Sequence, residues 1–441
     1  MSDWYRLDAS TAAALIHRGE LTSEALVAAC VERIAARERD VGAWQYLASE
    51  QALEHARKAD RSAALGPLHG VPIAVKDLID TFDMPTALGS PLYTDRRPSW
   101  DAACVAAARA AGAIVLGKTT TTEFASFHPG KTRNPRDPTR TPGGSSSGSA
   151  AAVADFMVPL AFGTQTAASV TRPAAFCGIV GYKATFGELS LSGVRPLAPS
   201  LDTLGIFARS VADVALMRGV VLGQSRSAPM SPATAPTHPA AVPVDPAAAP
   251  RFGICRTSLW PLAQPAARDA LELANARLRA AGASVEEVEL PASFDALIDA
   301  QRTIMTFETA RNYVFEMTRH ADALSASFLA ICAEGAKITC EAWLAALQRV
   351  EHARARLPDV FRRCDVFVTP ATPGEAPPIE GGTGDPVMSR MWTALGVPTL
   401  ALPVPRSAGT LPVAVQLVAG LHDDAMLLKI GDWSMRAFAA T

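Results

Sequence analysis

A glycine- and serine-rich loop, residues 143–149, limits the folds open to this chain because it runs directly into the apolar, alanine-rich segment 150–154. The loop reads Gly-Gly-Ser-Ser-Ser-Gly-Ser. A flexible linker can have this composition, but the loop opens at once into an apolar, helix-forming run. An ordered turn whose hydroxyl and N–H groups face a site explains both parts of the pattern. We therefore predict an ordered loop that leads into a buried helix.

Short apolar runs alternate with amphipathic segments along most of the chain. The runs typical of buried strands are residues 73–75, 113–116, 251–255, 284–290, 365–370 and 399–404. The segments typical of helices are residues 23–37, 47–62, 102–111, 266–281, 294–320 and 324–355. Thr22 is placed to cap the first of these helices. This alternation predicts an α/β fold built in layers.

Composition excludes several classes of protein. Of the 441 residues, 49% are apolar and 19% charged, which supports a large core and excludes a solvated disordered chain. A net charge of −2 gives no excess of positive charge for binding nucleic acid or an anionic membrane. The most apolar run, 150–162, contains Asp155 and Pro159 and is too short to span a bilayer.

Targeting and metal-binding signals are also missing from the sequence. The first ten residues have neither the basic nor the apolar region of a secretory signal. The seven cysteines form no CxxC pair, and the eight histidines show no HExxH spacing. We expect a cytoplasmic protein with reduced thiols, no metal and no cofactor. His69, His128 and Cys177 lie near the motifs described next, and we interpret them as structural.

Three motifs stand in order along the chain. They are residues 70–78 (Gly-Val-Pro-Ile-Ala-Val-Lys-Asp-Leu), the 143–149 loop, and residues 163–174 (Gly-Thr-Gln-Thr-Ala-Ala-Ser-Val-Thr-Arg-Pro-Ala). With these motifs, the chain resembles the amidase signature family over nearly its whole length. Further segments that resemble the family are 117–119, 123–124, 134–135, 176–183, 200–205 and 411–416.

The resemblance implies a catalytic triad of two serines and a lysine. By motif position, Ser169 would be the nucleophile, Ser145 a bridging serine that follows a cis peptide bond, and Lys76 the base. Ser146 would be a structural hydroxyl in the same loop. The implied oxyanion hole is formed by the backbone N–H groups of four successive residues: Thr166, Ala167, Ala168 and Ser169.

The chemistry of amide hydrolysis agrees with this assignment. A serine hydroxyl is a poor nucleophile at neutral pH unless a neighbouring base accepts its proton. Lysine can be that base only if its pKa is lowered, and burial is one way to lower it. Lys76 ends the apolar run 72–75, which is a plausible place for burial.

The resemblance also implies one large α/β/α domain over residues 1–441, with a mixed β-sheet covered by helices on both faces. Residues 1–65 would be its helical start, 66–215 the signature core and 251–441 the rest of the same domain. Residues 225–250, rich in proline and alanine, would be a linker or surface excursion.

The third motif departs from the family pattern. Gln165 stands where the family has aspartate, Ala167 and Ala168 replace two glycines, and Thr171 replaces arginine. A Gln165–Thr171 hydrogen bond could replace an aspartate–arginine pair, or Arg172 could supply the guanidinium. The two alanines favour negative φ, which leaves the geometry of the oxyanion hole open.

We interpret the chain as an amidase that cleaves the C–N bond of a small amide, carbamate or ureide, and that could form a homodimer. Its pocket walls would come from residues 124–129, 305–313 and 381–392. One alternative is the amidase component of a tRNA-dependent amidotransferase, which needs partner chains. A second is a catalytically silent binding protein on the same scaffold.

Overall fold

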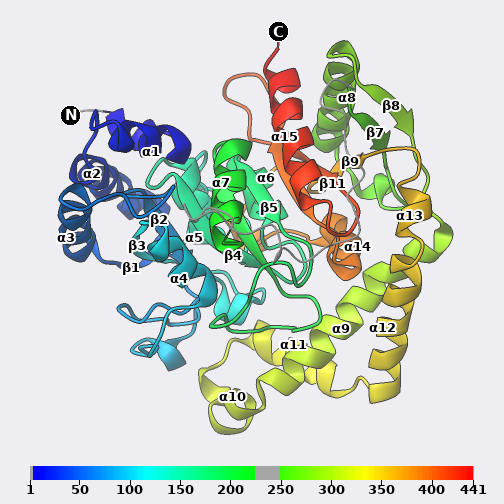
Figure 1. Cartoon of the computed structure of the whole chain (residues 1–441). Coiled ribbons are helices and arrows are strands. Elements are labelled where there is room, and N and C mark those ends of the chain that lie inside the picture. Colours follow the sequence, from blue (N-terminus) through cyan, green and yellow to red (C-terminus); the bar gives the residue numbers. More distant parts are fainter. Residues whose placement is uncertain (1–2, 224–248, 441) are drawn as a thin grey trace, which may run out of the picture.

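The computed structural model describes residues 3–223 and 249–440, and its backbone centres on one mixed β-sheet (Figure 1). Eleven strands pair in the order β1-β3-β2-β4-β6-β5-β10-β11-β9-β7-β8. Strands from both halves of the chain therefore lie in the same sheet, which confirms the predicted α/β fold with a large mixed sheet. The predicted excursion at 225–250 lies almost entirely outside the described residues.

The strands are short and mostly buried. Their bounds are β1 Trp44–Leu47, β2 Pro72–Lys76, β3 Ile114–Thr119, β4 Leu160–Gln165, β5 Val180–Lys183, β6 Thr203–Ala208, β7 Arg251–Ile254, β8 Ser284–Glu287, β9 Val366–Pro370, β10 Thr399–Pro403 and β11 Ala414–Val418. Strand β2 runs parallel to both of its neighbours, β3 and β4. The middle of the sheet, from β4 to β9, is antiparallel.

The α-helices lie on both faces of this sheet (Figure 1). Their bounds are α1 Ala9–His17, α2 Ser23–Val41, α3 Ser49–Asp60, α4 Ala103–Ala110, α5 Ser147–Ala154, α6 Thr171–Cys177, α7 Val211–Val221, α8 Pro265–Ala280, α9 Ala296–Asn312, α10 Val314–Arg319, α11 Ala326–Ala336, α12 Cys340–Arg354, α13 Leu357–Val360, α14 Val387–Leu395 and α15 Asp424–Ala439.

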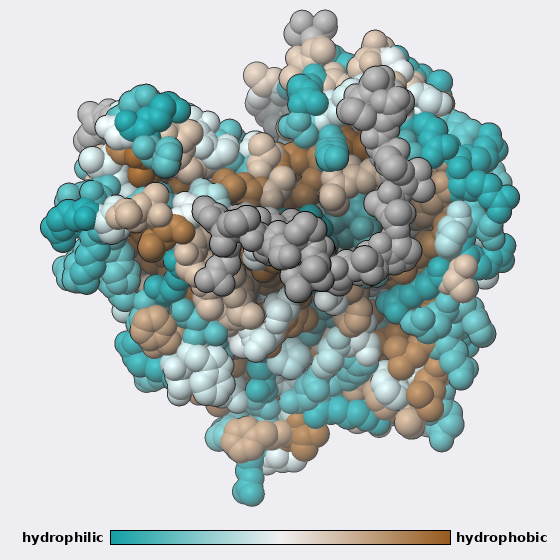
Figure 2. Space-filling model, in the orientation of Figure 1, coloured by the Kyte–Doolittle hydropathy of each residue, from teal (hydrophilic) through white to brown (hydrophobic). Residues whose placement is uncertain are grey.

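Alternating residues of the central strands divide the core into two layers. Ile73 and Val75 pack in the layer that contains α4, α7, α8 and α15. Ala74, which lies between them in β2, packs in the other layer with α2, α3, α5 and α6. This alternation follows from the two-residue period of a strand, and it leaves both faces of β2 dry. The outer surface visible in Figure 2 is a mixture of hydrophilic and hydrophobic residues.

Several predicted boundaries are correct and others are wrong. Thr22 caps α2 through its side chain, as expected. The predicted helix over 47–62 is wrong at its start, because Leu47 belongs to β1, which pairs antiparallel with β3. The predicted strand 284–290 ends early, because its partner β7 ends at Ile254, opposite Glu287. The predicted helix 294–320 is broken at Tyr313 into α9 and α10.

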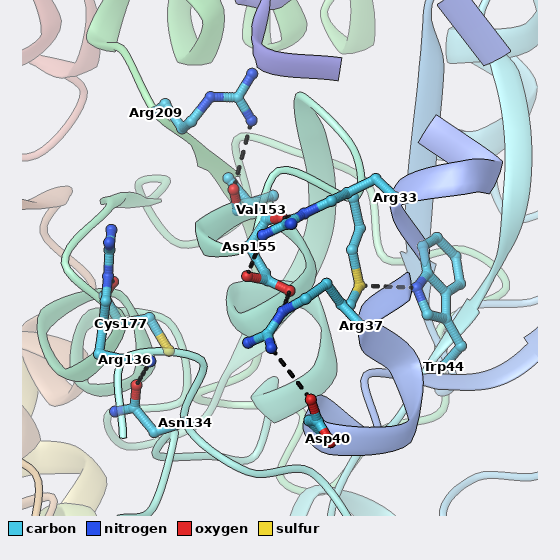
Figure 3. Close-up of polar contacts among 11 residues, drawn as sticks. Arg33, Arg37, Asp40, Trp44, Asn134, Arg136, Val153, Asp155, Cys177 and Arg209 are labelled. Carbon is cyan, nitrogen blue, oxygen red and sulfur yellow. Dashed lines mark hydrogen bonds and ion pairs between the residues drawn. The ribbon is translucent and has the colours of Figure 1, made fainter. Parts of the chain in front are cut away.

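The glycine- and serine-rich loop is buried throughout, which excludes the flexible-linker interpretation. Helix α5 follows it and is fixed at its far end (Figure 3). There the carboxylate of Asp155 forms ion pairs with Arg33 at 2.8 Å and Arg37 at 2.9 Å, both from α2. Trp44 Nε1 also donates to the sulfur of Met157 at 3.3 Å. The loop therefore precedes a helix that cannot shift easily against α2.

Candidate active site

Lys76 is the last residue of β2, and its side chain is completely buried. Its Nζ donates to Ser145 Oγ at 2.7 Å and to Thr164 Oγ1 at 2.8 Å. Within the described part of the chain it forms no ion pair. Burial therefore lowers the pKa of Lys76 well below its ordinary value, and the negative charge of Asp202 opposes this effect only in part. A buried amine of this kind can be neutral when a surface lysine is charged.

Ser145 lies in a loop with an unusual backbone. The peptide bond between Gly144 and Ser145 is cis. Gly143 has a φ of +81°, and a Cβ there would meet the backbone of Pro173 at 2.9 Å, so glycine is required. The next hydroxyl, Ser146 Oγ, donates to the Thr164 carbonyl at 3.2 Å and accepts from the Thr164 N–H at 3.3 Å. These bonds join the loop to β4.

Ser169 lies in the segment 166–169, between the end of β4 and the start of α6. None of the four N–H groups of this segment donates a hydrogen bond within residues 3–223 and 249–440. Two carbonyls of the segment are held from outside: Gln301 Nε2 donates to Thr166 O at 2.8 Å, and Thr393 Oγ1 donates to Ala167 O at 2.7 Å. The segment is thus fixed through its carbonyls while its N–H groups remain available to a ligand.

The structure brings Lys76 and Ser145 into contact, but Ser169 forms no hydrogen bond with either of them in the described part of the chain. Ala167 and Ala168, which replace glycines of the family pattern, have no positive φ. The segment therefore accommodates both alanines without the left-handed conformation that glycine would allow.

Gln165 shows how the altered third motif is held together. Its Oε1 accepts from the backbone N–H groups of Val170 at 2.8 Å and Thr171 at 3.0 Å, and its Nε2 donates to Thr393 Oγ1 at 3.0 Å. The expected Gln165–Thr171 hydrogen bond is therefore made to the backbone, and the buried Thr171 hydroxyl has no partner among the described residues. At Gln165 and Thr171, no side-chain pair replaces the family's aspartate and arginine.

Arg172 does not take the place of the missing arginine. Its Nη2 donates to the Gly144 carbonyl at 2.7 Å and to Thr383 Oγ1 at 3.0 Å, and its Nη1 donates to the Gly384 carbonyl. The guanidinium thus contacts the residue before Ser145 and the 381–392 segment, and not Gln165. The prediction that Arg172 could restore the family's pair is wrong, because the side chain is directed to other partners.

Two cavities meet at this site. A narrow one is lined by Ser169, Arg172, and residues from the 125–127 and 305–309 segments. A larger one, of about 270 Å³, is lined by Thr164, Asp202 and Arg195, among others. They share the lining residues Ala125, Thr166 and Leu197, so they lie next to each other. The predicted walls at 124–129 and 305–313 contribute to these cavities. Within the described residues, the 381–392 segment lines neither cavity and contacts the site through its bonds to Arg172 and Gln301.

Asp202 is a site residue that the motif analysis does not single out. Its carboxylate is buried and accepts from Thr166 Oγ1 at 2.5 Å and from the N–H groups of Leu197 at 2.8 Å and Ala198 at 3.0 Å. Burial raises the pKa of Asp202 to about 7, against the opposing effect of these hydrogen bonds. The signal that could have found it is its place in the family-like segment 200–205.

His69 and Cys177, which lie near the motifs in the sequence, have contacts or burial typical of structural residues. The ring of His69 contacts the Ala59 carbonyl at 3.1 Å. Cys177 is buried, and burial raises the pKa of its thiol to about 12, so it is not a thiolate at neutral pH. The described residues contain no group of three or more potential metal ligands. No helix in the described ranges is long and apolar enough to cross a bilayer.

Comparison with known proteins identifies the family of this chain. A family model described as Amidase matches residues 25–428. The chain belongs to the amidase signature family. A glutamyl-tRNA(Gln) amidotransferase subunit from Chloroflexus aggregans is 35% identical over 476 residues, covering 98% of this chain and 96% of that protein. The corresponding protein from Symbiobacterium thermophilum is 35% identical over 454 residues, with 93% of each chain covered.

Solved structures of amidases share the fold. The native peptide amidase from Stenotrophomonas maltophilia has a TM-score of 0.83 and 30% identity, with 99% of this chain and 97% of that one covered. The 6-aminohexanoate cyclic dimer hydrolase complexed with substrate has a TM-score of 0.86 and 25% identity, with 100% and 98% covered. The amidase signature fold is therefore shown over the whole described chain.

Proposed function

We propose that this chain hydrolyses a carboxamide through an acyl-enzyme formed on Ser169. The observation that carries the proposal is the buried amine of Lys76, with Nζ 2.7 Å from Ser145 Oγ. A buried lysine without an ion-pair partner is costly to keep charged. In its neutral form, the Lys76 amine can accept a proton from the Ser145 hydroxyl.

The proposed reaction begins when Ser145 relays the proton of Ser169 to Lys76. Ser169 Oγ then attacks the amide carbon and forms a tetrahedral oxyanion. The amine leaves with a proton returned through Ser145, which breaks the C–N bond. Water then attacks the resulting ester while its proton passes through Ser145 to Lys76, and the same proton returns through Ser145 to Ser169 as the acid leaves. Lys76 therefore ends the cycle in the protonation state in which it began.

The four N–H groups of residues 166–169 are the proposed donors to the oxyanion. Donors of this type contribute about 3–4 kcal/mol each to lowering the barrier in serine hydrolases. The absence of any other acceptor for them among the described residues supports this role. The hydrogen bonds from Gln301 and Thr393 to the neighbouring carbonyls would hold the segment in place.

The chain could act within an amidotransferase complex or as a free-standing amidase, and the curated relatives favour the complex. These relatives are glutamyl-tRNA(Gln) amidotransferase subunits and match over nearly their full length. They support the amidotransferase alternative better than the free-standing amidase of the first interpretation. In that role the chain would hydrolyse the carboxamide of an amide donor and pass the ammonia to partner chains.

A free-standing small-molecule amidase is the second candidate. It is favoured by the structural likeness to the peptide amidase, at 30% identity, and by the altered third motif. A silent binding protein is a weaker candidate, because Lys76, Ser145 and Ser169 are all present and the first two are in contact.

The deciding experiment assays the purified chain alone on aliphatic amides, anilides, carbamates, ureides and glutamine, beside Ser169→Ala and Lys76→Ala. Activity that disappears in both variants supports the triad, and activity that survives Ser169→Ala contradicts it. A chain that is inactive alone but releases ammonia from glutamine with amidotransferase partner chains supports the role in a complex. A folded chain whose Ser169 does not react with a fluorophosphonate probe favours the silent protein.

A further inference from the structure

Arg172 has no acidic partner among the described residues, although it is almost completely buried. The residue is 2% exposed. Its hydrogen bonds go to two backbone carbonyls and a threonine hydroxyl, all of them neutral. Its Nε–H has no hydrogen-bond partner in the described part of the chain. A buried charge is ordinarily paired with an opposite one, so this arginine needs an explanation.

A second arginine increases the positive charge at this place. Arg390, from α14, donates to Gln301 Oε1 and also forms no ion pair among residues 3–223 and 249–440. Burial and the positive charge of Arg390 together lower the pKa of Arg172 to about 9. The carboxylate of Asp385 offsets this lowering in part, but it forms no ion pair with either guanidinium. The site therefore holds two guanidinium groups that form no ion pair among the described residues.

The location of Arg172 connects this charge to the substrate. Arg172 and Ser169 line the same narrow cavity. The Arg172 N–H donates to the Ala168 carbonyl at 2.9 Å, so its backbone lies one turn from the proposed oxyanion donors. A ligand that reaches Ser169 in this cavity also lies near the guanidinium.

We propose that Arg172 binds a carboxylate of the substrate, so that the chain acts on short amides that also carry an acid group. This inference rests on the proposed function, because it concerns the substrate of the same site. The Nε–H of Arg172, which has no partner among the described residues, can donate a charge-assisted hydrogen bond to a carboxylate, a group that guanidinium side chains bind well. The narrow cavity favours a carboxylate separated from the reacting amide by only a few carbon atoms.

A purely structural role for Arg172 predicts a different result. If it only holds the Gly144 carbonyl and the 383–384 backbone, its loss would reduce activity on neutral and anionic substrates equally. If it binds a carboxylate, its loss would reduce the preference for anionic substrates. The ratio of kcat/KM values for two matched substrates separates these roles.

The experiment compares succinamate with 4-oxopentanamide, in which an acetyl group replaces the carboxylate. Asparagine, which is succinamate with an added ammonium group, is the third substrate and tests whether that group is accepted. The variants are Arg172→Gln and Arg172→Lys, with Arg133→Gln as the control; Arg133 is exposed, and its guanidinium donates to the Pro138 carbonyl.

We expect wild type to prefer succinamate, and Arg172→Gln to lower the succinamate/4-oxopentanamide ratio about 10- to 100-fold, mainly through KM. Arg172→Lys should recover part of the ratio, and Arg133→Gln should leave it unchanged. An equal loss on both substrates, or a wild type that prefers 4-oxopentanamide, overturns the inference. If Arg172→Gln does not fold, the wild-type preference and competitive inhibition by succinate decide.

Calorimetry with succinate separates failure of this inference from failure of the proposed function. A wild type that hydrolyses neutral amides but neither binds succinate nor accepts succinamate refutes the inference alone. A wild type that hydrolyses no amide, either alone or with amidotransferase partner chains, yet binds succinate in a way that Arg172→Gln abolishes, refutes the proposed hydrolysis and supports the carboxylate site.

Discussion

Thr164 offers a test of the proposed base that does not remove the base itself. Its Oγ1 accepts a hydrogen bond from Lys76 Nζ at 2.8 Å. A charged ammonium donates a stronger hydrogen bond than a neutral amine, so this contact favours the protonated lysine. Thr164→Val removes the acceptor and nearly preserves the shape of the side chain. The pKa of Lys76 should therefore fall further.

The size of this effect follows from the energy of one hydrogen bond. One hydrogen bond contributes about 0.5–1.5 kcal/mol net. Because a change of one pKa unit corresponds to about 1.4 kcal/mol, the pKa of Lys76 should fall by roughly 0.4 to 1. Because only neutral Lys76 can accept the proton, activity should fall as the pH drops through its pKa. The acidic limb of the kcat/KM profile should therefore move to lower pH in Thr164→Val.

The assay is a pH profile of amide hydrolysis for wild type, Thr164→Val and the control Thr164→Ser, which keeps the hydroxyl. The rate at which a fluorophosphonate labels Ser169 gives the same profile without a substrate. An acidic limb that stays in place, or moves to higher pH, would refute the assignment of Lys76 as the base. A limb that moves equally in Thr164→Ser would show that the hydroxyl is not responsible.

Three further predictions follow from the described contacts. Lys76→Met should keep the fold but lower kcat about 10²- to 10⁴-fold, and a loss under tenfold in steady-state assays would exclude the base role. Gln165→Asp should lower the free energy of unfolding in urea by about 1–3 kcal/mol. The shorter side chain holds its oxygen further from the N–H groups of Val170 and Thr171, and it has no N–H to donate to Thr393. Adding Thr171→Arg should recover the lost stability, and no recovery would contradict the coupling of the two positions. Burial lowers the pKa of Lys183 from 10.5 to about 7, so between these values the unfolded chain binds a proton that the folded chain lacks, and stability rises with pH. Lys183→Met should therefore have a higher free energy of unfolding in urea than wild type near pH 7, and this difference should shrink toward pH 10. A difference in the free energy of unfolding that does not change with pH would contradict the burial argument.

The sequence predicts the parts of the site that lie within continuous motifs. Lys76 ends an apolar run, and its burial follows from that position in β2. The contact with Ser145 is implied only by resemblance, because residues so far apart in the chain have no spacing rule that joins them. Thr164 and Asp202 are not predicted as partners, since their roles depend on which side chains the sheet brings to one edge.

Other parts depend on tertiary contacts that no local pattern encodes. Strand β1 has only four residues and lies between two helices, so the sequence pattern includes its last residue in the next helix. Only the pairing with β3 identifies it as a strand. The partners of Arg172 at 383–384 lie 211 and 212 residues further along the chain. Its orientation away from Gln165 is therefore not accessible from the third motif.

The parallel pairing of β2 with β4 has a consequence for how enzymes on this scaffold can change. Val75 lies opposite Phe162 in that pairing, so the next residues, including Lys76 and Thr164, emerge at one edge of the sheet. Backbone hydrogen bonds set the position of the base, whereas α9 and α14 provide residues that contact the cavity or its supporting loop. Substitutions of the residues of α9 that line the cavity can therefore alter the accepted substrate without moving the base, whereas substitutions in α14 would disturb the segment 166–169 that Thr393 holds.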